Sequence, residues 1–366
     1  MTRQWLDAHD VPMGVVRNDY LEKPGGDIAL VQTYLEGIGG GRLVPCRESN
    51  SQEAQLRCAV VANVDRYFEF AETVARLQAR TSNLIIAPIH PPEAGIRAYA
   101  KHADLSGVSR IGRVIQDPAK LERLRHLGRT KSFSSALRSV ASTRSVIAHS
   151  LSAHEVLVQA PSEAVELRKT FSCDLDATFI PNPIGFVEKL NQDRDIDVIS
   201  VGRIEPRKNQ LRLAQALAGS GYRVLFLGSR GRDLTYCRKL EEVVERDPRM
   251  TLLPSVSLAD LRYLLGRSRV CVGISFMEVV SLAQLDAVGH GAQLLTTCHS
   301  YSRDYFGPYC SQVDPLLSGE ELRSEVSALL ARGINRDGIE HLQSSFPADR
   351  ARDEFASLVA RMGRNR

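Results

Sequence analysis

The chain has 366 residues, of which 43% are hydrophobic and 25% are charged, and its formal net charge at pH 7 is +4. This composition excludes a disordered or fibrous protein, and the length predicts two domains, because a single hydrophobic core stops growing at a smaller size. The small positive charge does not indicate a nucleic-acid-binding protein. The seven cysteines are scattered without a C-x-x-C pair, which argues against a zinc site and a disulfide framework and fits a reducing cytoplasm.

The first sixteen residues, MTRQWLDAHDVPMGVV, lack the apolar segment of a secretory signal peptide. No apolar run in the chain approaches the roughly 18 residues that a membrane-spanning helix needs. We therefore expect a cytoplasmic protein, and any membrane contact is expected to be peripheral, on the inner face of the plasma membrane.

The N-terminal half alternates between short apolar runs and amphipathic stretches. Helices are expected to include residues 27–37 and 67–80. Strands are expected at residues 13–16, 58–62, 84–89 and 145–148. This alternation predicts a parallel sheet with helices on both faces.

A second alternating series begins at Asp197. Its strands are expected at residues 198–202, 223–228, 251–256, 270–275 and 292–297. Its helices are expected at residues 210–218, 234–245 and 258–267, followed by one that carries the acids near residue 280. The join lies in residues 179–194, which begin with Pro-Asn-Pro turn chemistry and end in a polar stretch.

A basic loop follows the first strand of the second series. The sequence DVISVGRIEPRK, residues 197–208, predicts a buried strand followed by Gly202, Arg203 and, five residues later, Lys208. In an open parallel sheet, ligands bind beyond the carboxyl ends of the strands, and two cations beside a helix start suit a pyrophosphate. The alternative is an exposed basic loop, since Arg207 lies there as well.

Two acids follow the strand expected at residues 270–275. Glu278 is followed eight residues later by Asp286, and two helical turns span about 7 residues, so both acids are expected to face roughly one cleft. Paired carboxylates at a strand end suit a polyhydroxylated ligand, because each accepts hydrogen bonds from neighbouring hydroxyls. The alternative is a solvated helix with two unrelated acids.

Two N-terminal segments also lie at expected strand ends. The sequence KPGGD contains Gly25 and Gly26, which allow the backbone to approach a phosphate or sugar closely, and Asp27, which can cap a helix. It is not G-x-G-x-x-G, so a dinucleotide cofactor is disfavoured. His90 ends the run LIIAPIH, where it could bond a sugar hydroxyl or polarise a reacting group. The alternatives are an ordinary turn and a structural histidine.

Residues 110–144 form the most basic section of the chain, with nine Lys or Arg residues against two acids. Such a segment is attracted to an anionic membrane surface or to the phosphates of a lipid-linked acceptor. It lacks the interleaved aromatic residues of single-strand nucleic-acid binders. The alternative is a solvated helix face.

Together these motifs resemble the retaining glycosyltransferases of family 4. The resemblance rests on Gly202-Arg203 with Lys208, on Ser275 before the acids at 278 and 286, and on the following apolar strand. The segment SRDYFGPYCSQVDP, residues 302–315, is similar to a segment of members that build bacterial surface polysaccharides. The resemblance covers residues 195–315 well and the N-terminal half thinly.

The resemblance implies an α/β protein with the GT-B fold, in which two Rossmann-like doubly wound domains face each other across a cleft. The N-terminal, acceptor-side domain is expected at residues 1–188 and the nucleotide-sugar-binding domain at residues 189–345. Residues 346–366 are expected to form a C-terminal helix that packs back toward the N-terminal domain. Within it, the amphipathic stretch 348–362 has Phe355, Leu358 and Val359 on one side.

The resemblance also implies a role for each matching residue. Arg203 and Lys208 would hold the donor diphosphate and stabilise the charge that develops as it leaves, without a metal. Glu278 would contact the donor sugar, and Asp286 would accept the ribose hydroxyls. The expected catalytic residues are Glu278, Arg203, Lys208 and His90. The expected donor-binding residues are Gly25, Gly26, Gly202, Ser275, Val279, Val280 and Asp286.

The sequence departs from the family pattern at two places. The second acid is Asp286 where the family has Glu, which shortens its reach by roughly one bond length. Val279, Val280 and Ser281 stand where the family has a glycine-rich, aromatic segment, and the branched side chains of the two valines are expected to narrow the sugar pocket.

The predicted activity is transfer of a sugar, with retention of configuration, from a nucleotide diphosphate-sugar to a saccharide acceptor, lipid-linked, in cell-surface polysaccharide biosynthesis. The expected partners are this donor and acceptor, and neither a nucleic acid nor a separate cofactor is expected. The alternatives are a catalytically inactive GT-B partner subunit and a transferase that uses a small soluble acceptor.

Overall fold

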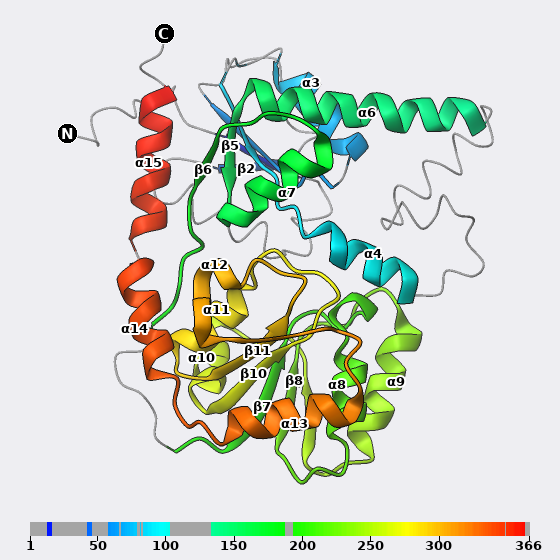
Figure 1. The fold of residues 1–366 in the computed structure, drawn as a ribbon, viewed down its shortest axis with the longest axis vertical. Coiled ribbons are helices and arrows are strands. Elements are labelled where there is room, and N and C mark those ends of the chain that lie inside the picture. Colours follow the sequence, from blue (N-terminus) through cyan, green and yellow to red (C-terminus); the bar gives the residue numbers. More distant parts are fainter. Residues whose placement is uncertain are drawn as a thin grey trace. The chain divides into compact units, whose positions relative to one another are not determined.

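The computed structural model describes residues 13–16, 42–45, 58–65, 67–78, 81, 83–102, 133–186, 193–347 and 349–362. The chain forms two compact units, each with its own parallel sheet (Figure 1). Unit 1 comprises residues 1–90, 104–183 and 349–366, and unit 2 comprises residues 91–103 and 184–348.

The sheet of unit 1 has six parallel strands in the order β2-β1-β3-β4-β5-β6. From β1 the chain moves to β2 on one side and then to β3 and its successors on the other, so the sheet is doubly wound. The strands are β1 (Met13–Val16), β2 (Arg42–Pro45), β3 (Ala59–Ala62), β4 (Leu84–Ala87), β5 (Glu155–Val158) and β6 (Ala177–Phe179).

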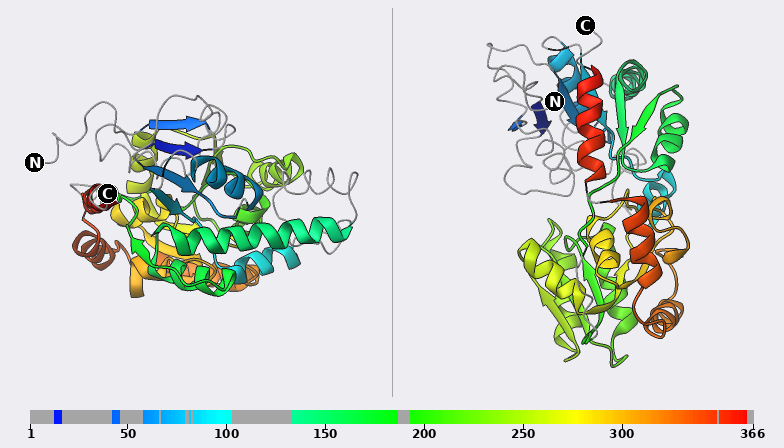
Figure 2. Two further views of the ribbon diagram at one scale, coloured as in Figure 1. Left: turned by 90° about the horizontal axis from the view of Figure 1, so that it is seen from above. Right: turned by 90° about the vertical axis from the view of Figure 1, so that its left-hand side faces the viewer.

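In β3, β4 and β5, alternate residues point to opposite faces of the unit 1 sheet, and residues on both faces are buried. Val61 and Ile86 pack into one core with α3 (Tyr67–Gln78), α6 (Phe133–Ala153) and α7 (Pro161–Phe171). Val60 and Ile85 pack into a second core with α15 (Arg350–Met362). Figure 2 shows α15 running alongside the strands of this unit.

The C-terminal helix α15 belongs to unit 1 although it follows all of unit 2 in the sequence. Its residues Phe355, Leu358 and Val359 are buried against the sheet, which is the apolar stripe that the sequence predicts. The stripe has the i, i+3, i+4 spacing of one helix face.

The sheet of unit 2 has six parallel strands in the order β12-β11-β10-β7-β8-β9. The chain runs outward from β7 to β9 and then returns to the other side of β7 with β10, so the strand order reverses between β7 and β10. The strands are β7 (Ile196–Val201), β8 (Val224–Leu227), β9 (Met250–Leu253), β10 (Ser268–Gly273), β11 (Gln293–Thr297) and β12 (Ser311–Val313).

Helices cover this second sheet as well. The core on one face joins Leu213, Leu240 and Val326, from α8, α9 and α13, to the strands. Helix α11 contacts β10, β11, α10 and α14. The bounds are α8 (Gln210–Leu217), α9 (Leu234–Glu245), α10 (Leu258–Gly266), α11 (Leu282–Gly289), α12 (Arg303–Phe306), α13 (Gly319–Leu330) and α14 (Arg336–Ser345), with short 3₁₀ turns η3 (Pro206–Lys208) and η4 (Gly307–Tyr309).

Helix α4 (Glu93–His102) is part of unit 2, although the chain before and after it belongs to unit 1. Gly95 lets this helix approach unit 2 closely, since a Cβ there would lie 2.4 Å from the carbonyl oxygen of Phe276. The rings of Tyr99 and His102 pack on Phe276, with centroids 5.4 and 4.8 Å away. These contacts account for the place of α4 in unit 2. The domains expected at residues 1–188 and 189–345 are continuous blocks, and they would put this helix in the first domain.

The expected secondary structure differs from the observed one mainly in unit 1. Residues 145–148 were expected to form a strand but lie within α6, so that prediction is wrong. A four-residue apolar run does not distinguish a strand from a buried helix segment, and here Ile147 and Leu151 bury one helix face. The helix expected at residues 27–37 lies outside the described residues.

Candidate functional site

The candidate site lies in unit 2, beyond the carboxyl ends of β7 and β10. This is where the strand order reverses, the position at which open α/β sheets bind ligands. The loop after β7 carries the basic residues and the loop after β10 carries Glu278. The site therefore draws on two segments that are 70 residues apart in the sequence.

The loop after β7 begins at Gly202, whose backbone has φ +149°. Gly228, at the end of β8, lies directly against it, because a Cβ on Gly228 would be 2.0 Å from the carbonyl oxygen of Gly202. Two glycines thus allow this loop to turn across the end of the sheet. Gln210 Nε2 fixes the turn by donating to the carbonyl oxygens of Gly202 and Arg203, at 3.2 and 2.8 Å.

Hydrogen bonds join the loop after β7 to the end of β10. Asn209, in the left-handed conformation with φ +61°, donates from Nδ2 to the carbonyl oxygens of Ile274 and Pro315, at 3.3 and 2.8 Å. The backbone nitrogen of Phe276 donates to the carbonyl oxygen of Arg207 at 2.8 Å. These bonds hold the basic loop against the acidic one before any ligand is considered.

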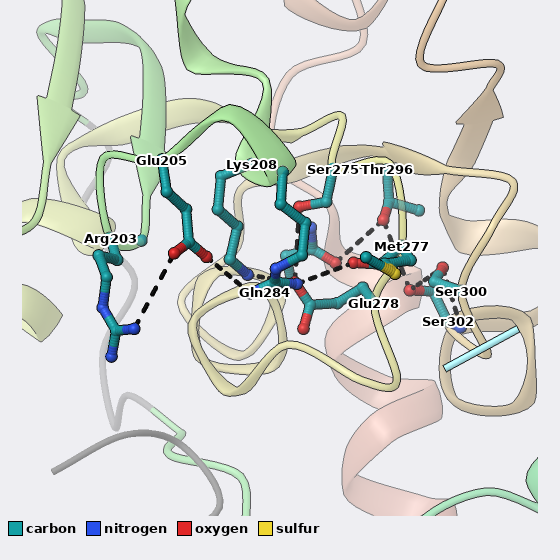
Figure 3. A network of polar contacts seen from close by, with 12 residues as sticks. Arg203, Glu205, Lys208, Ser275, Met277, Glu278, Gln284, Thr296, Ser300 and Ser302 are labelled. Atoms are coloured by element: carbon teal, nitrogen blue, oxygen red, sulfur yellow. Dashed lines mark hydrogen bonds and ion pairs between the residues drawn. The ribbon is translucent and has the colours of Figure 1, made fainter. Parts of the chain in front are cut away.

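Lys208 and Glu278 form an ion pair at the centre of the site (Figure 3). Both side chains are 17% exposed, and Ser275 Oγ lies 3.5 Å from the same carboxylate oxygen, Glu278 Oε2. Burial opposes ionisation of Glu278, but the cations Lys208 and Arg207 outweigh it and hold the pKa of the carboxyl below its ordinary value. Glu278 is therefore an acceptor of hydrogen bonds at neutral pH and not a proton donor.

A second acid, Glu205, lies between two arginines in the same loop. Its oxygens are 2.9 Å from Arg207 Nη2 and 3.9 Å from Arg203 Nη1. Arg207 also donates to the carbonyl oxygen of Met277 at 3.0 Å. The site thus combines three cations with two carboxylates, and the side chain of Arg203, 48% exposed, presents charge to solvent.

Buried polar side chains form a second hydrogen-bonded group in unit 2. Thr296 Oγ1 donates to Gln284 Oε1 at 3.0 Å, and Ser300 Oγ donates to Ser302 Oγ at 2.8 Å (Figure 3). Sequence reasoning missed Gln284 and Glu205 as site residues. Glu205 stands inside the motif GRIEPRK, whereas no pattern indicated that Gln284 would face Thr296.

Asp286 lies within α11, whereas Glu278 lies before this helix. The helix begins at Leu282, so Glu278 precedes it in an irregular segment, and the expectation that two helical turns join the acids is wrong. Asp286 Oδ1 accepts from the backbone nitrogen of Gly185 at 2.8 Å, and Arg262 Nε lies 3.4 Å from Oδ2. Asp286 therefore already contacts the chain that enters unit 2.

The valines after Glu278 are buried, with exposures of 7% for Val279 and 6% for Val280. The carbonyl oxygen of Val279 accepts from the backbone nitrogen of Tyr301 at 3.0 Å. Ser275, at 3% exposure, lies just beyond the end of β10. The structure thus brings Gly202, Lys208, Ser275, Glu278 and both valines into one pair of loops.

His90 belongs to unit 1 and is fully buried. Its Nδ1 lies 2.6 Å from Asp65 Oδ1, its Nε2 lies 3.4 Å from Thr170 Oγ1, and its backbone nitrogen donates to Glu163 at 2.8 Å. Burial raises the pKa of Glu163 to about 7. These contacts favour a role for His90 in the interior of unit 1 over direct contact with a substrate.

Other predicted features fall partly or wholly outside the described residues. Gly25 and Gly26 are among these, as are residues 110–132 of the basic section. Arg144 is described, and it donates to the carbonyl oxygen of Thr170 and lies over the ring of Phe171. Among the described residues, no helix is long and apolar enough to cross a membrane.

No protein-family model and no curated protein matches the sequence. The structure is similar to sucrose-phosphate synthase from Thermosynechococcus elongatus, with a TM-score of 0.71 at 14% identity, over 96% of this chain and 98% of that one. It is also similar to AviGT4, a glycosyltransferase involved in avilamycin A biosynthesis, with a TM-score of 0.56 at 11% identity, over 97% and 99% of the chains.

A third similar structure is the E. coli trehalose-6-phosphate protein bound with UDP-2-fluoro glucose, with a TM-score of 0.56 at 9% identity, over 96% and 95% of the chains. These neighbours are GT-B glycosyltransferases. With its two parallel, doubly wound units, the chain has the GT-B fold.

Proposed function

We propose that the protein is a retaining glycosyltransferase, similar to family 4, that moves a sugar from a nucleotide diphosphate-sugar to a hydroxyl of a saccharide. One observation carries the proposal. Lys208, Arg203 and Glu278 lie together at the strand-order reversal of a GT-B unit, where cations suit a diphosphate and a carboxylate suits sugar hydroxyls.

In this proposal, Arg203 and Lys208 bind the donor diphosphate. As the bond between sugar and phosphate breaks, negative charge grows on the leaving phosphate, and preorganised cations stabilise it more in the transition state than in the ground state. Because Lys208 forms an ion pair with Glu278, its ammonium group would interact with both the diphosphate and this carboxylate.

Glu278 accepts hydrogen bonds from the donor sugar, consistent with a carboxyl group whose pKa is held low by Lys208 and Arg207 against the effect of burial. The leaving phosphate, on the same face as the acceptor, then takes the proton of the incoming hydroxyl, which gives retention. The backbone of Val279 and Val280 lies beside the same sugar, and Asp286 bonds the ribose if it exchanges its contact with Arg262.

The acceptor is proposed to be a saccharide, lipid-linked, in the synthesis of a cell-surface polysaccharide. This rests on the resemblance of residues 302–315 to members that make such polymers. The basic section, residues 110–144, is proposed to contact the anionic membrane that carries the acceptor. Charge-neutralising substitutions at Arg113, Arg123 and Arg125 should then weaken sedimentation with anionic liposomes, while unchanged sedimentation would remove the membrane contact.

The donor is tested with a panel of nucleotide sugars in thermal-shift assays on the full chain. A donor at about 100 times its dissociation constant adds about 2.7 kcal/mol to the free energy of unfolding, so the true donor should raise Tm measurably. Incubation of that donor with saccharide acceptors, followed by NMR of the product, should show retention at the anomeric carbon.

Two outcomes would change the proposal. Inversion at the anomeric carbon would exclude the retaining mechanism. Binding of a nucleotide sugar with neither transfer nor hydrolysis would favour the alternative of an inactive partner subunit. The observation that favours this alternative is the pair of buried, branched residues Val279 and Val280, which are expected to narrow the sugar pocket.

A further inference from the structure

Cys298, His299 and Asp314 gather at the carboxyl ends of β11 and β12 in unit 2. The ligand-capable atoms of these three side chains, a thiol sulfur, a ring nitrogen and a carboxylate oxygen, all lie within 4.8 Å of one another. Cys298 and Asp314 are exposed and His299 is half-buried, so an ion can reach the cluster from solvent.

The fold brings these residues together through strand pairing. Strands β11 and β12 are parallel with Thr297 opposite Val313, and the backbone nitrogen of Cys298 donates to the carbonyl oxygen of Val313 at 2.9 Å. Cys298 and Asp314 are thus the residues that directly follow two neighbouring strands.

A turn places His299 beside its sequence neighbour. Thr297 Oγ1 accepts from the backbone nitrogen of His299 at 3.1 Å, and Ser300 Oγ donates to the carbonyl oxygen of Thr297 at 2.9 Å. In an extended strand, successive side chains point to opposite faces. The bend lets residues 298 and 299 contribute to one cluster.

Two of the three side chains are held in position by further contacts. His299 Nδ1 lies 3.1 Å from the carbonyl oxygen of Phe276, which can only accept a hydrogen bond, so the proton is on Nδ1 and the lone pair is on Nε2. Asp314 Oδ1 accepts from the backbone nitrogen of Leu316 at 2.7 Å, which leaves Oδ2 available. Outer contacts of this kind orient the ligands of protein metal sites.

We propose that Cys298, His299 and Asp314 bind a divalent cation of the zinc class, with water as the fourth ligand. A thiolate and an imidazole favour zinc over magnesium or calcium, which prefer oxygen, and one carboxylate with two such ligands suits a tetrahedral ion. On binding, the thiol of Cys298 gives its proton to solvent and the sulfur donates a lone pair to the ion.

The cluster is linked to the Glu278 loop by backbone contacts. The backbone nitrogen of Glu278 donates to the carbonyl oxygen of His299 at 3.1 Å, and Phe276 holds the ring of the same histidine. A bound ion would therefore fix the turn at residues 298–300 and, through it, one side of the loop that carries Glu278. The cluster itself uses none of the residues proposed to bind the donor.

The inference is tested by direct binding, which does not depend on the proposed glycosyl transfer. The full chain, freed of metal by a chelator, is titrated with Zn²⁺ by calorimetry and with Co²⁺ by absorption. One equivalent of Zn²⁺ should bind, and Co²⁺ should give a thiolate-to-cobalt charge-transfer band. Loss of the band in Cys298→Ser would assign it to this sulfur.

Matched variants make the test decisive. Cys298→Ser and Asp314→Asn should each weaken zinc affinity by at least the roughly 10–100-fold that is usual for loss of an outer contact. Cys310→Ser, which removes a half-buried thiol just before β12, should leave the zinc affinity unchanged. Asp314→Asn retains the acceptor for Leu316, so it remains informative if the cysteine variant folds poorly.

Three results would overturn the site. These are the absence of zinc binding by the unmodified chain, a zinc affinity unchanged in both ligand variants, and a cobalt spectrum without the thiolate band. The second would mean binding by other surface groups.

Discussion

Arg203 and Lys208 present different environments to a diphosphate although they belong to one loop. The side chain of Arg203 is 48% exposed and lies 3.9 Å from Glu205, whereas Lys208 is 17% exposed and paired with Glu278. Removal of Arg203 therefore leaves no buried charge without a partner. Removal of Lys208 leaves Glu278 without its principal cation.

This difference gives the first prediction. Arg203→Ala and Lys208→Ala should each lower kcat/KM by about 100-fold or more, because each loses a preorganised charge for the leaving phosphate. Only Lys208→Ala should also lower the free energy of unfolding, by on the order of 2 kcal/mol, since the half-buried carboxylate of Glu278 then loses its ion-pair partner. Kinetics with the identified donor and urea unfolding measure the two effects.

Lys239→Ala is the control for both variants, because Lys239 is an exposed lysine on α9 of the same unit. It should change neither quantity. Near-normal activity in Arg203→Ala or Lys208→Ala would withdraw that residue from the diphosphate site.

Glu163 carries a second prediction at the same scale, in unit 1. It is fully buried beside His90 and Asp65, and burial raises its pKa from 4.5 to about 7. The folded state holds this proton more tightly than the unfolded state, so its contribution to stability is complete below pH 4.5 and is lost as pH rises through about 7. Stability should fall across this window.

Urea unfolding between pH 5 and about 8 would measure the slope, and Glu163→Gln should flatten it, because the amide does not titrate. Glu166→Gln, on the same helix α7, should leave the slope as in the unmodified chain. An unchanged slope in Glu163→Gln would assign the pH dependence to other groups.

Among the elements, α4 packs against the Glu278 loop although the two are far apart in the sequence. A Cβ at Gly95 would lie 2.4 Å from the carbonyl oxygen of Phe276 and 2.9 Å from Cβ of His299. The backbone oxygen cannot move without moving the loop. The helix and the loop are therefore packed at the limit that a glycine permits.

Gly95→Ala should destabilise unit 2 by about 1–3 kcal/mol, as overpacking usually does, despite the better helix propensity of alanine. Thermal unfolding and donor KM would report the loss. Gly266→Ala is the matched control, because Gly266 ends α10 with nothing within 4 Å of its added Cβ. It should be neutral or slightly stabilising, and equal behaviour of the two variants would contradict the close packing of α4.

The elements of unit 2 were easier to predict than those of unit 1. Strands β8 and β11 are buried along their whole length, and β7 and β10 are mostly buried. They alternate with amphipathic helices, so the apolar runs and the helix periodicity lead to the same assignment. In unit 1, β2, β5 and β6 are short, with three or four residues each, and the apolar run at residues 145–148 belongs to α6. Short runs carry too few residues for their period to decide.

For the whole molecule, α15 shows that unit 1 is not one continuous piece of chain, because this helix follows all of unit 2 in the sequence. Its apolar side chains complete the second core of unit 1, where Phe355 is fully buried. Phe355→Ala should therefore cost about 3–5 kcal/mol in the unfolding of unit 1, as loss of a buried aromatic ring does.

Urea unfolding of Phe355→Ala, monitored by hydrogen exchange in each unit, should show that the strands of unit 1 lose their protection first. Arg352→Ala, on the exposed face of α15, is the control and should have little effect. Protection lost first in unit 2 would contradict the assignment of the helix.

The sequence by itself determined the parallel α/β class, the basic loop after β7 and the acid after β10, because strand burial and loop chemistry are local properties. The tertiary structure alone decided which of these groups meet. It paired Lys208 with Glu278, inserted α4 into unit 2, returned α15 to unit 1 and tied Asp286 to Gly185 and Arg262. It also gathered Cys298, His299 and Asp314, where scattered cysteines had argued against a zinc site. Strand order and register set such contacts, and they depend on packing between segments far apart in the chain, which no local pattern records.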